Sequence, residues 1–199
     1  MGRRSDHSRP ELEAMIVAEG RRQMEEMGFA RFSAREVAKK IGYSIGTLYN
    51  VFGTYDRLIF AINARTLASW SLYLEARLAE AGEDRIEALV RAYFAFARAQ
   101  PKSWAAIYDH RIPAGDAMPD FFVAALSELT GIVVAEVARA LPEDRRETAP
   151  DLARSLLATV HGHCAFAANG TFALLGEGDP VGAAVARVRE GLAAASAKD

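Results

Sequence analysis

Side chains able to read nucleic acid gather in one stretch of this 199-residue chain, the string FSAREVAKKIGYSIGTLYNVFGTYDRL that starts at Phe32. Two short helices joined by a tight turn at Gly42 are expected here, the first starting at Ser33 and the second running from Ser44 to about Val51. A capping box, formed by Ser33 and a glutamate three residues on, marks the first start. Helices this short are costly to nucleate alone, so packing must hold them.

The free side of the second short helix carries hydrogen-bonding groups, on Thr47, Tyr49 and Asn50. Asparagine can pair with adenine, and threonine and tyrosine hydroxyls can reach base edges or phosphates. The apolar residues of the helix pair are Val37, Ala38, Ile41 and Leu48. They would pack on a preceding helix whose apolar stripe is Leu12, Met15, Ile16, Met24 and Met27. The pattern predicts a reader of double-stranded DNA, and the alternative is a three-helix core unit that meets no DNA.

The elements that must position these groups are helices, because apolar residues recur at spacings of three and four and no convincing run alternates with period two. The sequence predicts an all-α fold of about nine helices, over 10–27, 33–41, 44–51, 54–81, 84–99, 101–111, 119–141, 150–175 and 180–195. Pro10 and Gly28 bracket the first helix, and Asp179 caps the last in front of Pro180. Residues 112–115 are expected to form a loop.

Composition restricts the class of protein. The chain is 51% hydrophobic and has a net charge of −2, which argues against coating nucleic acid by charge alone. Residues 1–60 carry a net charge of +2, so this part of the chain is better suited to bind a polyanion than the remainder, which is negatively charged. No apolar run approaches the roughly 18 residues of a membrane span, and the start lacks the apolar region of a signal peptide. A single cysteine excludes an internal disulfide, and we expect a cytoplasmic protein without membrane contact.

The DNA-reading stretch resembles the DNA-binding domain of the TetR family of transcriptional regulators. The resemblance rests on Gly28-Phe29, Phe32-Ser33, Val37-Ala38, Ile41-Gly42, Ser44-Ile45-Gly46-Thr47-Leu48-Tyr49, Phe52 and Leu58. It covers about residues 10–62. It implies a helix-turn-helix domain over 1–62 and a helical ligand-binding and dimerisation domain over 63–199.

The resemblance also implies DNA contacts from the second and third helices and a phosphate site at the start of the fourth. The residues are Ser33, Arg35, Ser44, Thr47, Tyr49, Asn50 and Thr54. Family members often have basic residues or histidine where this chain has Ile45, Val51, Gly53 and Tyr55. The phosphate contacts are therefore expected from Arg3, Arg4, Arg9, Arg35, Lys39, Lys40 and Arg57. Fewer cationic contacts predict a shallower dependence of binding on salt.

In this family the C-terminal part binds a small molecule and forms the dimer. The resemblance thus implies an effector of unknown identity and a homodimer through the last two helices. Residues suited to that interface are Ser155, Ala158, Gly162, Ala165, Ala168, Val181, Ala184, Val185, Val188 and Leu192, unless they face the core of one chain. Candidate effector contacts are Tyr93, Trp104, Tyr108, Phe122 and His161, which are plain core if no cavity lies between the helices.

Metal and enzyme chemistry find little support. In the run His161-Gly162-His163-Cys164, His161 and Cys164 share a helix face but His163 points elsewhere, which leaves a metal site incomplete. Nothing marks an acid partner or an oxyanion hole for Cys164. We therefore expect no enzyme, cofactor or metal.

The prediction is a repressor released from a palindromic operator by a small-molecule ligand. The alternatives are an enzyme or carrier with a vestigial helix-turn-helix, and a sequence-independent DNA-organising protein.

Overall fold

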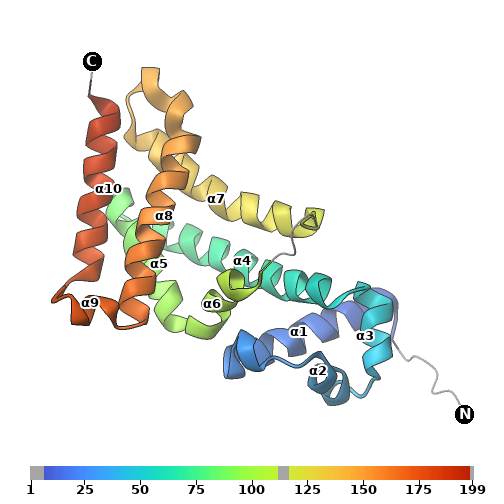
Figure 1. Cartoon of the computed structure of the whole chain (residues 1–199). Coiled ribbons are helices and arrows are strands. Elements are labelled where there is room, and N and C mark those ends of the chain that lie inside the picture. Colours follow the sequence, from blue (N-terminus) through green and yellow to red (C-terminus); the bar gives the residue numbers. More distant parts are fainter. Residues whose placement is uncertain (1–6, 112–116, 198–199) are drawn as a thin grey trace, which may run out of the picture. The chain divides into compact units, whose positions relative to one another are not determined.

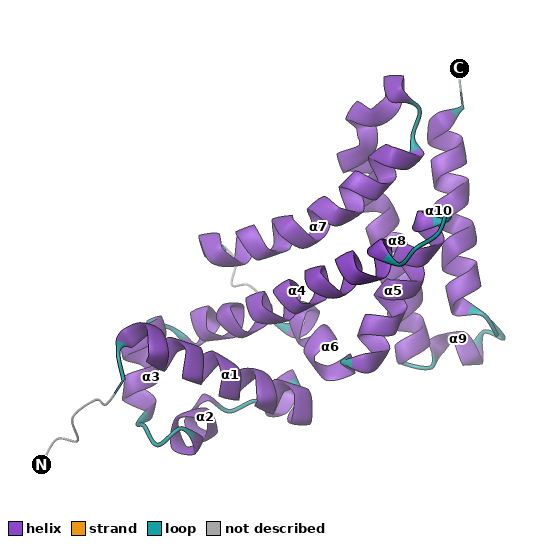
Figure 2. Cartoon of the chain, turned by 180° about the vertical axis from the view of Figure 1, so that it is seen from behind, coloured by secondary structure: helices purple, strands orange, loops and turns teal. Residues whose placement is uncertain are grey.

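The computed structural model describes residues 7–111 and 117–197, and within these ranges every regular element is a helix (Figures 1 and 2). The α-helices are α1 Arg9–Met27, α2 Ala34–Lys40, α3 Ile45–Phe52, α4 Tyr55–Ala79, α5 Arg85–Ala99, α6 Pro101–Asp109, α7 Asp120–Ala140, α8 Ala149–Ala168, α9 Thr171–Leu174 and α10 Pro180–Ser196. Two 3-10 helices, Phe29–Arg31 and Glu143–Thr148, lie between them. The all-α prediction is confirmed, whereas the predicted loop at 112–115 lies outside the described residues.

Side-chain caps set where the first helices begin. Ser8 and Glu11 form a capping box at α1, in which the Ser8 backbone N–H donates to the Glu11 carboxylate at 2.7 Å. At α2 the Ser33 hydroxyl accepts from the Glu36 backbone N–H at 3.4 Å, while the Glu36 carboxylate lies 3.9 Å from the Lys39 ammonium. Of the two hydrogen bonds of the predicted capping box at Ser33, the structure thus shows the one that the serine hydroxyl accepts.

The long helix predicted over 150–175 is wrong at its end, because α8 stops at Ala168 and the short α9 follows. Gly170 adopts φ +79°, a left-handed conformation that glycine adopts without steric penalty. The Asn169 side-chain oxygen accepts from the backbone N–H and the hydroxyl of Thr171, at 3.0 and 2.6 Å. An Asn-Gly pair is a turn signal, and here it interrupts an otherwise continuous apolar pattern.

The chain forms two compact units. The first comprises Met1–Ala68 and Gln100–Leu126, and the second Ser69–Ala99 and Ser127–Asp199. α4 and α7 each continue from one unit into the other along the chain. These compact units do not coincide with the two predicted functional domains, 1–62 and 63–199. The boundary between the functional domains remains a prediction.

The first unit is built around α1, with Ile16, Met24, Val37 and Leu48 almost fully buried. At Gly20 a Cβ atom would lie 2.5 Å from the Ile62 side chain, so glycine lets α1 and α4 approach closely. The predicted apolar stripe of α1 is right for Leu12, Ile16 and Met24. Met27 is 42% exposed, because it lies in the last turn before the helix ends at the rim of this core.

The second unit packs α5, α8 and α10 together with the second half of α4. Trp70 stacks on Phe96 with ring centroids 4.9 Å apart. Arg85 forms a bidentate ion pair with Glu136, both bonds 2.8 Å long, which joins α5 to α7 and holds the pKa of Glu136 below its usual value. At Gly191 a Cβ atom would lie 2.8 Å from Leu156, so α10 and α8 are in close contact.

One expectation about membranes needs correction. Among the described residues, α7 is long and apolar enough to cross a membrane, judged by length and composition alone. The sequence expectation overlooked it because Glu128 and Glu136 divide the apolar run. Glu136 is 5% exposed and pairs with Arg85 inside the second unit.

Candidate nucleic-acid interface

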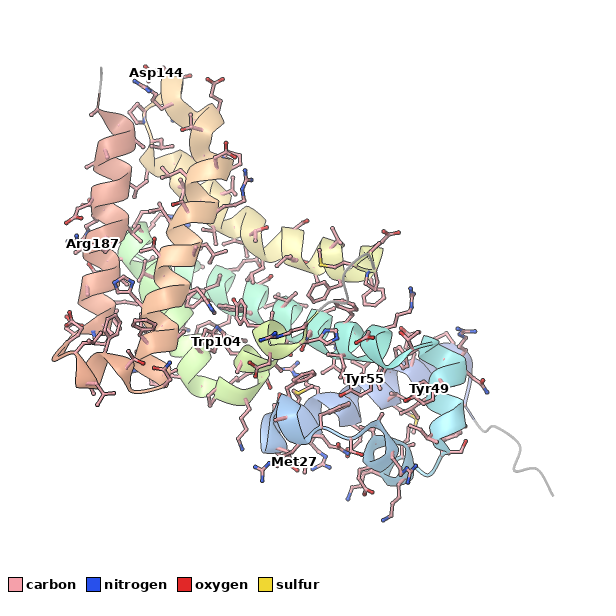
Figure 3. The ribbon with its side chains drawn as sticks, viewed as in Figure 1. Met27, Tyr49, Tyr55, Trp104, Asp144 and Arg187 are labelled. Carbon is pink, nitrogen blue, oxygen red and sulfur yellow. The ribbon has the colours of Figure 1, made fainter. Side chains whose placement is uncertain are left out.

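The third helix presents two different faces. Leu48 and Phe52 are buried, at 1% and 8% exposure, and anchor α3 in the core of the first unit. Tyr49 is 42% exposed, and Asn50 beside it is exposed as well. Figure 3 shows Tyr49 on α3 and Tyr55 at the start of α4. A rigid short helix therefore displays one phenol and one carboxamide to solvent.

Several hydroxyls proposed as DNA contacts already bond within the protein. The Ser44 hydroxyl accepts from the Thr47 backbone N–H at 3.2 Å and lies 3.0 Å from the Thr47 hydroxyl. The Thr54 hydroxyl accepts from the Arg57 backbone N–H at 3.1 Å, and Ser33 caps α2. These side chains fix helix starts. Any contact they make with DNA must share their remaining hydrogen-bonding capacity.

Three cationic side chains of α2 are exposed, those of Arg35, Lys39 and Lys40. Lys39 lies 3.9 Å from the Glu36 carboxylate, and both side chains are well exposed, so this ion pair is weak and screened. Cations on such an exposed helix can approach phosphates without losing a buried partner.

The N-terminal end of α1 braces the helix pair, which the sequence did not reveal. The Arg9 guanidinium donates to the backbone carbonyl of Val51 at 3.0 Å. The His7 imidazole lies 2.7 Å from the Tyr43 hydroxyl in the turn between α2 and α3. Arg9, from which a phosphate contact is expected, thus also bonds to the last turn of α3, and its phosphate contact stays a prediction. The expected contributors Arg3 and Arg4 lie outside the described residues.

The N-terminus of α4, with the free backbone N–H groups of its first turn, follows α3 directly in the sequence. Thr54 precedes it, and Asp56 and Arg57 stand in its first turn. The pKa of the Tyr55 phenol is raised, chiefly by burial and further by the charges of Asp56 and Tyr49.

The predicted effector contacts divide between the two units. In the second unit, the Tyr93 hydroxyl lies 2.9 Å from Nδ1 of His161, and burial lowers the pKa of that imidazole. In the first unit, Trp104 meets the edge of Tyr108 at 5.4 Å between centroids. Phe122, also in the first unit, packs on Phe60 at 4.9 Å.

The second unit contains an apolar cavity of about 40 Å³. Residues of α4, α5, α7, α8 and α10 line it, namely Leu74, Ile86, Leu89, Val90, Tyr93, Val133, Val137, Leu156, Leu157, Val160 and Val188. Of the five predicted effector contacts, Tyr93 is in this lining. A drug-sized ligand needs a pocket of roughly 300 Å³ or more, so the cavity must expand to hold one.

The two histidines of the His161–Cys164 run bond to different groups. The His163 imidazole donates to the Thr159 carbonyl at 2.8 Å, and burial raises the pKa of the Cys164 thiol to about 11. A thiol of that kind is protonated at neutral pH and unreactive. Among residues 7–111 and 117–197, no three His, Cys, Asp or Glu side chains cluster in a way that could hold a metal ion.

Two short capped helices joined at Gly42, with the second displaying an exposed polar face, define a helix-turn-helix protein. Family profiles agree with this class: the profile of bacterial regulatory proteins of the tetR family matches residues 16–62, and that of the tetracyclin repressor-like C-terminal domain matches residues 86–190. The chain belongs to the tetR family of bacterial regulatory proteins.

Related proteins fit this assignment. An HTH-type transcriptional regulator of Mycobacterium bovis is 28% identical over 135 residues, which are 66% of this chain and 57% of the relative. An HTH-type transcriptional regulator of Mycobacterium tuberculosis matches to the same extent. The chain spans little more than half the length of these curated relatives.

Solved structures share the fold. A protein of unknown function from Rhodococcus sp. RHA1 has a TM-score of 0.72 and 24% identity, covering 98% of this chain and all of the other. The multidrug binding protein EbrR, in complex with imidazole, has a TM-score of 0.61 and 19% identity, covering 98% of both chains.

Proposed function

We propose that this chain is a transcriptional regulator that binds operator DNA as a homodimer, with α3 in the major groove. The observation that carries the proposal is the exposed Tyr49–Asn50 pair on a helix whose opposite face is buried through Leu48 and Phe52. In a dimer the two copies of α3 would enter successive major grooves about 34–36 Å apart. The operator is then near-palindromic.

Asn50 and Tyr49 are the proposed base readers, because their polar atoms face solvent on α3. Arg35, Lys39 and Lys40 are the proposed phosphate contacts of α2. The remaining contacts are proposed for the cap residues Ser33, Ser44, Thr47 and Thr54, which would use hydroxyl capacity left over from capping.

For the dimer we propose the outward face of α8 together with α9. Ser155, Ala158 and Gly162 lie on that face without being buried, and small residues allow two helices to pack closely. Leu174 and Leu175 stand beside it, 89% and 69% exposed. Exposed large apolar side chains of this kind mark interaction sites.

The apolar residues of α10 do not contribute as expected. Ala184, Val185, Val188 and Leu192 are buried within the second unit, where α10 packs on α8 and α5. Their burial favours the alternative that they are core of one chain, and we propose that α10 takes part in the dimer through its other side.

For the effector we propose a small apolar molecule with a single polar group. It would widen the cavity beside Tyr93, and the Tyr93–His161 pair would bind its polar group. α4 is one uninterrupted helix of 25 residues, so displacing its second half would also move its first turn and release the operator. Such release requires an effector that prefers the non-binding state. In this proposal the protein is a repressor.

The experiment is a gel-shift titration of duplexes tiled across the region upstream of its own gene, with salt varied. A specific band is expected, with Asn50→Ala weakening it by about tenfold or more, since a bidentate base contact is worth about 1–3 kcal/mol. Ser44→Ala is a comparison for stability alone, because Ser44 is itself a proposed DNA contact: losing its cap should lower the unfolding free energy by about 1 kcal/mol, and Asn50→Ala should not.

Three outcomes would contradict the proposal. Absence of a specific band at low salt with an intact dimer would favour a carrier or enzyme with a vestigial helix-turn-helix. Equal affinity for every duplex would favour a DNA-organising protein. Unchanged affinity of Asn50→Ala would overturn the contact assignment.

A further inference from the structure

A buried histidine joins the end of α6 to the first turn of α4 within the first compact unit. His110 follows α6, its side chain is 4% exposed, and its Nε2 lies 2.8 Å from Oδ1 of Asp56. An ionised carboxylate only accepts hydrogen bonds, so the imidazole donates here. The Asp56 side chain, which is 40% exposed, therefore has one oxygen turned toward the protein.

Aromatic side chains surround the His110 imidazole. The imidazole meets the Phe60 ring edge-on, 4.8 Å between centroids, and Phe29 lies at 5.8 Å on another side. α6 itself is held in the unit by two further bonds. The Asn63 amide donates to the Ala106 carbonyl at 3.1 Å, and the Lys102 ammonium donates to the Glu26 carbonyl at 2.6 Å. The imidazole, and the end of α6 that carries it, are thus held in place by several contacts within the first unit.

Asp56 is placed where its charge matters for DNA. It is the second residue of α4, and the free N–H groups of a helix N-terminus attract any anion within reach, a carboxylate as well as a phosphate. Arg57 is the only cationic residue between Phe52 and Phe60. An unrestrained Asp56 would both repel a phosphate and compete with it for these N–H groups.

We propose that His110 is a positioning residue for DNA binding: by holding the Asp56 carboxylate toward α6, it leaves the first turn of α4 open to a DNA phosphate. The inference rests on the proposed function, since it needs operator binding through this unit. It assigns to α6 a role in DNA affinity without any contact between α6 and DNA.

The test measures affinity for the selected upstream duplex by fluorescence anisotropy over a series of salt concentrations. The variants are His110→Phe, which keeps a ring and removes the donor, Asp56→Asn, and the two combined. His163→Phe, a change of the same type in the other compact unit, is the matched control. His110→Gln offers an amide donor in the same place, and unfolding midpoints of all variants verify folding.

We expect His110→Phe to bind roughly tenfold more weakly at low salt, with the difference shrinking as salt screens the freed charge. The combined variant should return to within about twofold of Asp56→Asn, because the amide carries no charge to release. His110→Gln should recover part of the affinity, and His163→Phe should match the unchanged protein.

Two results would overturn the inference alone: His110→Phe binding as tightly as the unchanged protein, or the combined variant remaining as weak as His110→Phe. Should His110→Phe not fold, His110→Gln and its combination with Asp56→Asn decide in the same way. If the unchanged protein binds no upstream duplex specifically, the proposed function fails, and this inference fails with it.

Discussion

At the scale of single residues, the side chains of α3 and of the helix starts beside it divide into those that stabilise the fold and those that are exposed and available to bind DNA. The hydroxyls of Ser44 and Thr54 already cap helices, at 3.2 and 3.1 Å from the N–H groups they accept. Tyr49 and Asn50 are exposed instead. Because capping uses a hydroxyl's acceptor capacity, sequence-specific recognition in this unit depends most on the carboxamide and the phenol of α3.

The His161 imidazole gives a prediction about pH. Burial lowers its pKa below 6.5, so the unfolded chain binds a proton there at a pH where the folded chain does not. Stability should therefore fall as pH drops below about 6.5, and His161→Gln should flatten the fall. Tyr93→Phe should keep it, because burial is the cause. Unfolding free energies from urea titrations at matched pH check this, and equal slopes for His161→Gln and the unchanged protein would refute it.

Local patterns predicted single residues well only where the cause was local. The period of the apolar positions placed Val37 and Leu48 in the core, and the serines before α2 and α3 are caps. The bond between Tyr93 and His161 joins positions 68 residues apart, and that between Asp56 and His110 joins positions 54 apart. No local spacing signals such pairs, since tertiary packing alone brings them together.

At the scale of elements, helix ends with a side-chain cap could be predicted. Asp179 accepts from the Gly182 backbone N–H at 2.9 Å, and α10 begins at Pro180 as expected. The interruption of α8 was missed, because Ala165, Ala167 and Leu174 continue an apolar helical pattern across Asn169 and Gly170. Periodicity describes which faces are apolar, whereas backbone conformation at one glycine decides where the helix stops.

That glycine is open to a direct test. Gly170→Ala should lower the unfolding free energy by about 1 kcal/mol, because alanine is strained at φ +79°. Gly178→Ala is the matched control in the following loop, where no Cβ would meet an atom within 4 Å and φ is not in the left-handed range. Urea unfolding of both variants measures the difference. An unchanged Gly170→Ala protein would mean that α8 and α9 join without this conformation.

At the scale of the whole molecule, each compact unit is built from two segments that are separated in the sequence. α6 lies between two segments of the second unit along the chain, yet it belongs to the first unit with α1 to α3. The sequence suggested one boundary after residue 62, since the helix-turn-helix pattern ends there. The Asn63 and Lys102 bonds that tie α6 to the first unit join positions far apart in sequence and could not be read from it.

The proposed homodimer makes the last prediction. Leu174 and Leu175, exposed by 89% and 69%, should be covered by the second copy, so Leu174→Glu with Leu175→Glu places two charges in an apolar contact. Analytical ultracentrifugation is expected to show monomers, and operator affinity should fall because one α3 reads only half of a near-palindrome. Leu72→Glu, 66% exposed on α4, is the matched control and should stay dimeric. If the double variant sediments as a dimer, α9 is not in the interface, and the dimer must form through surfaces without these leucines.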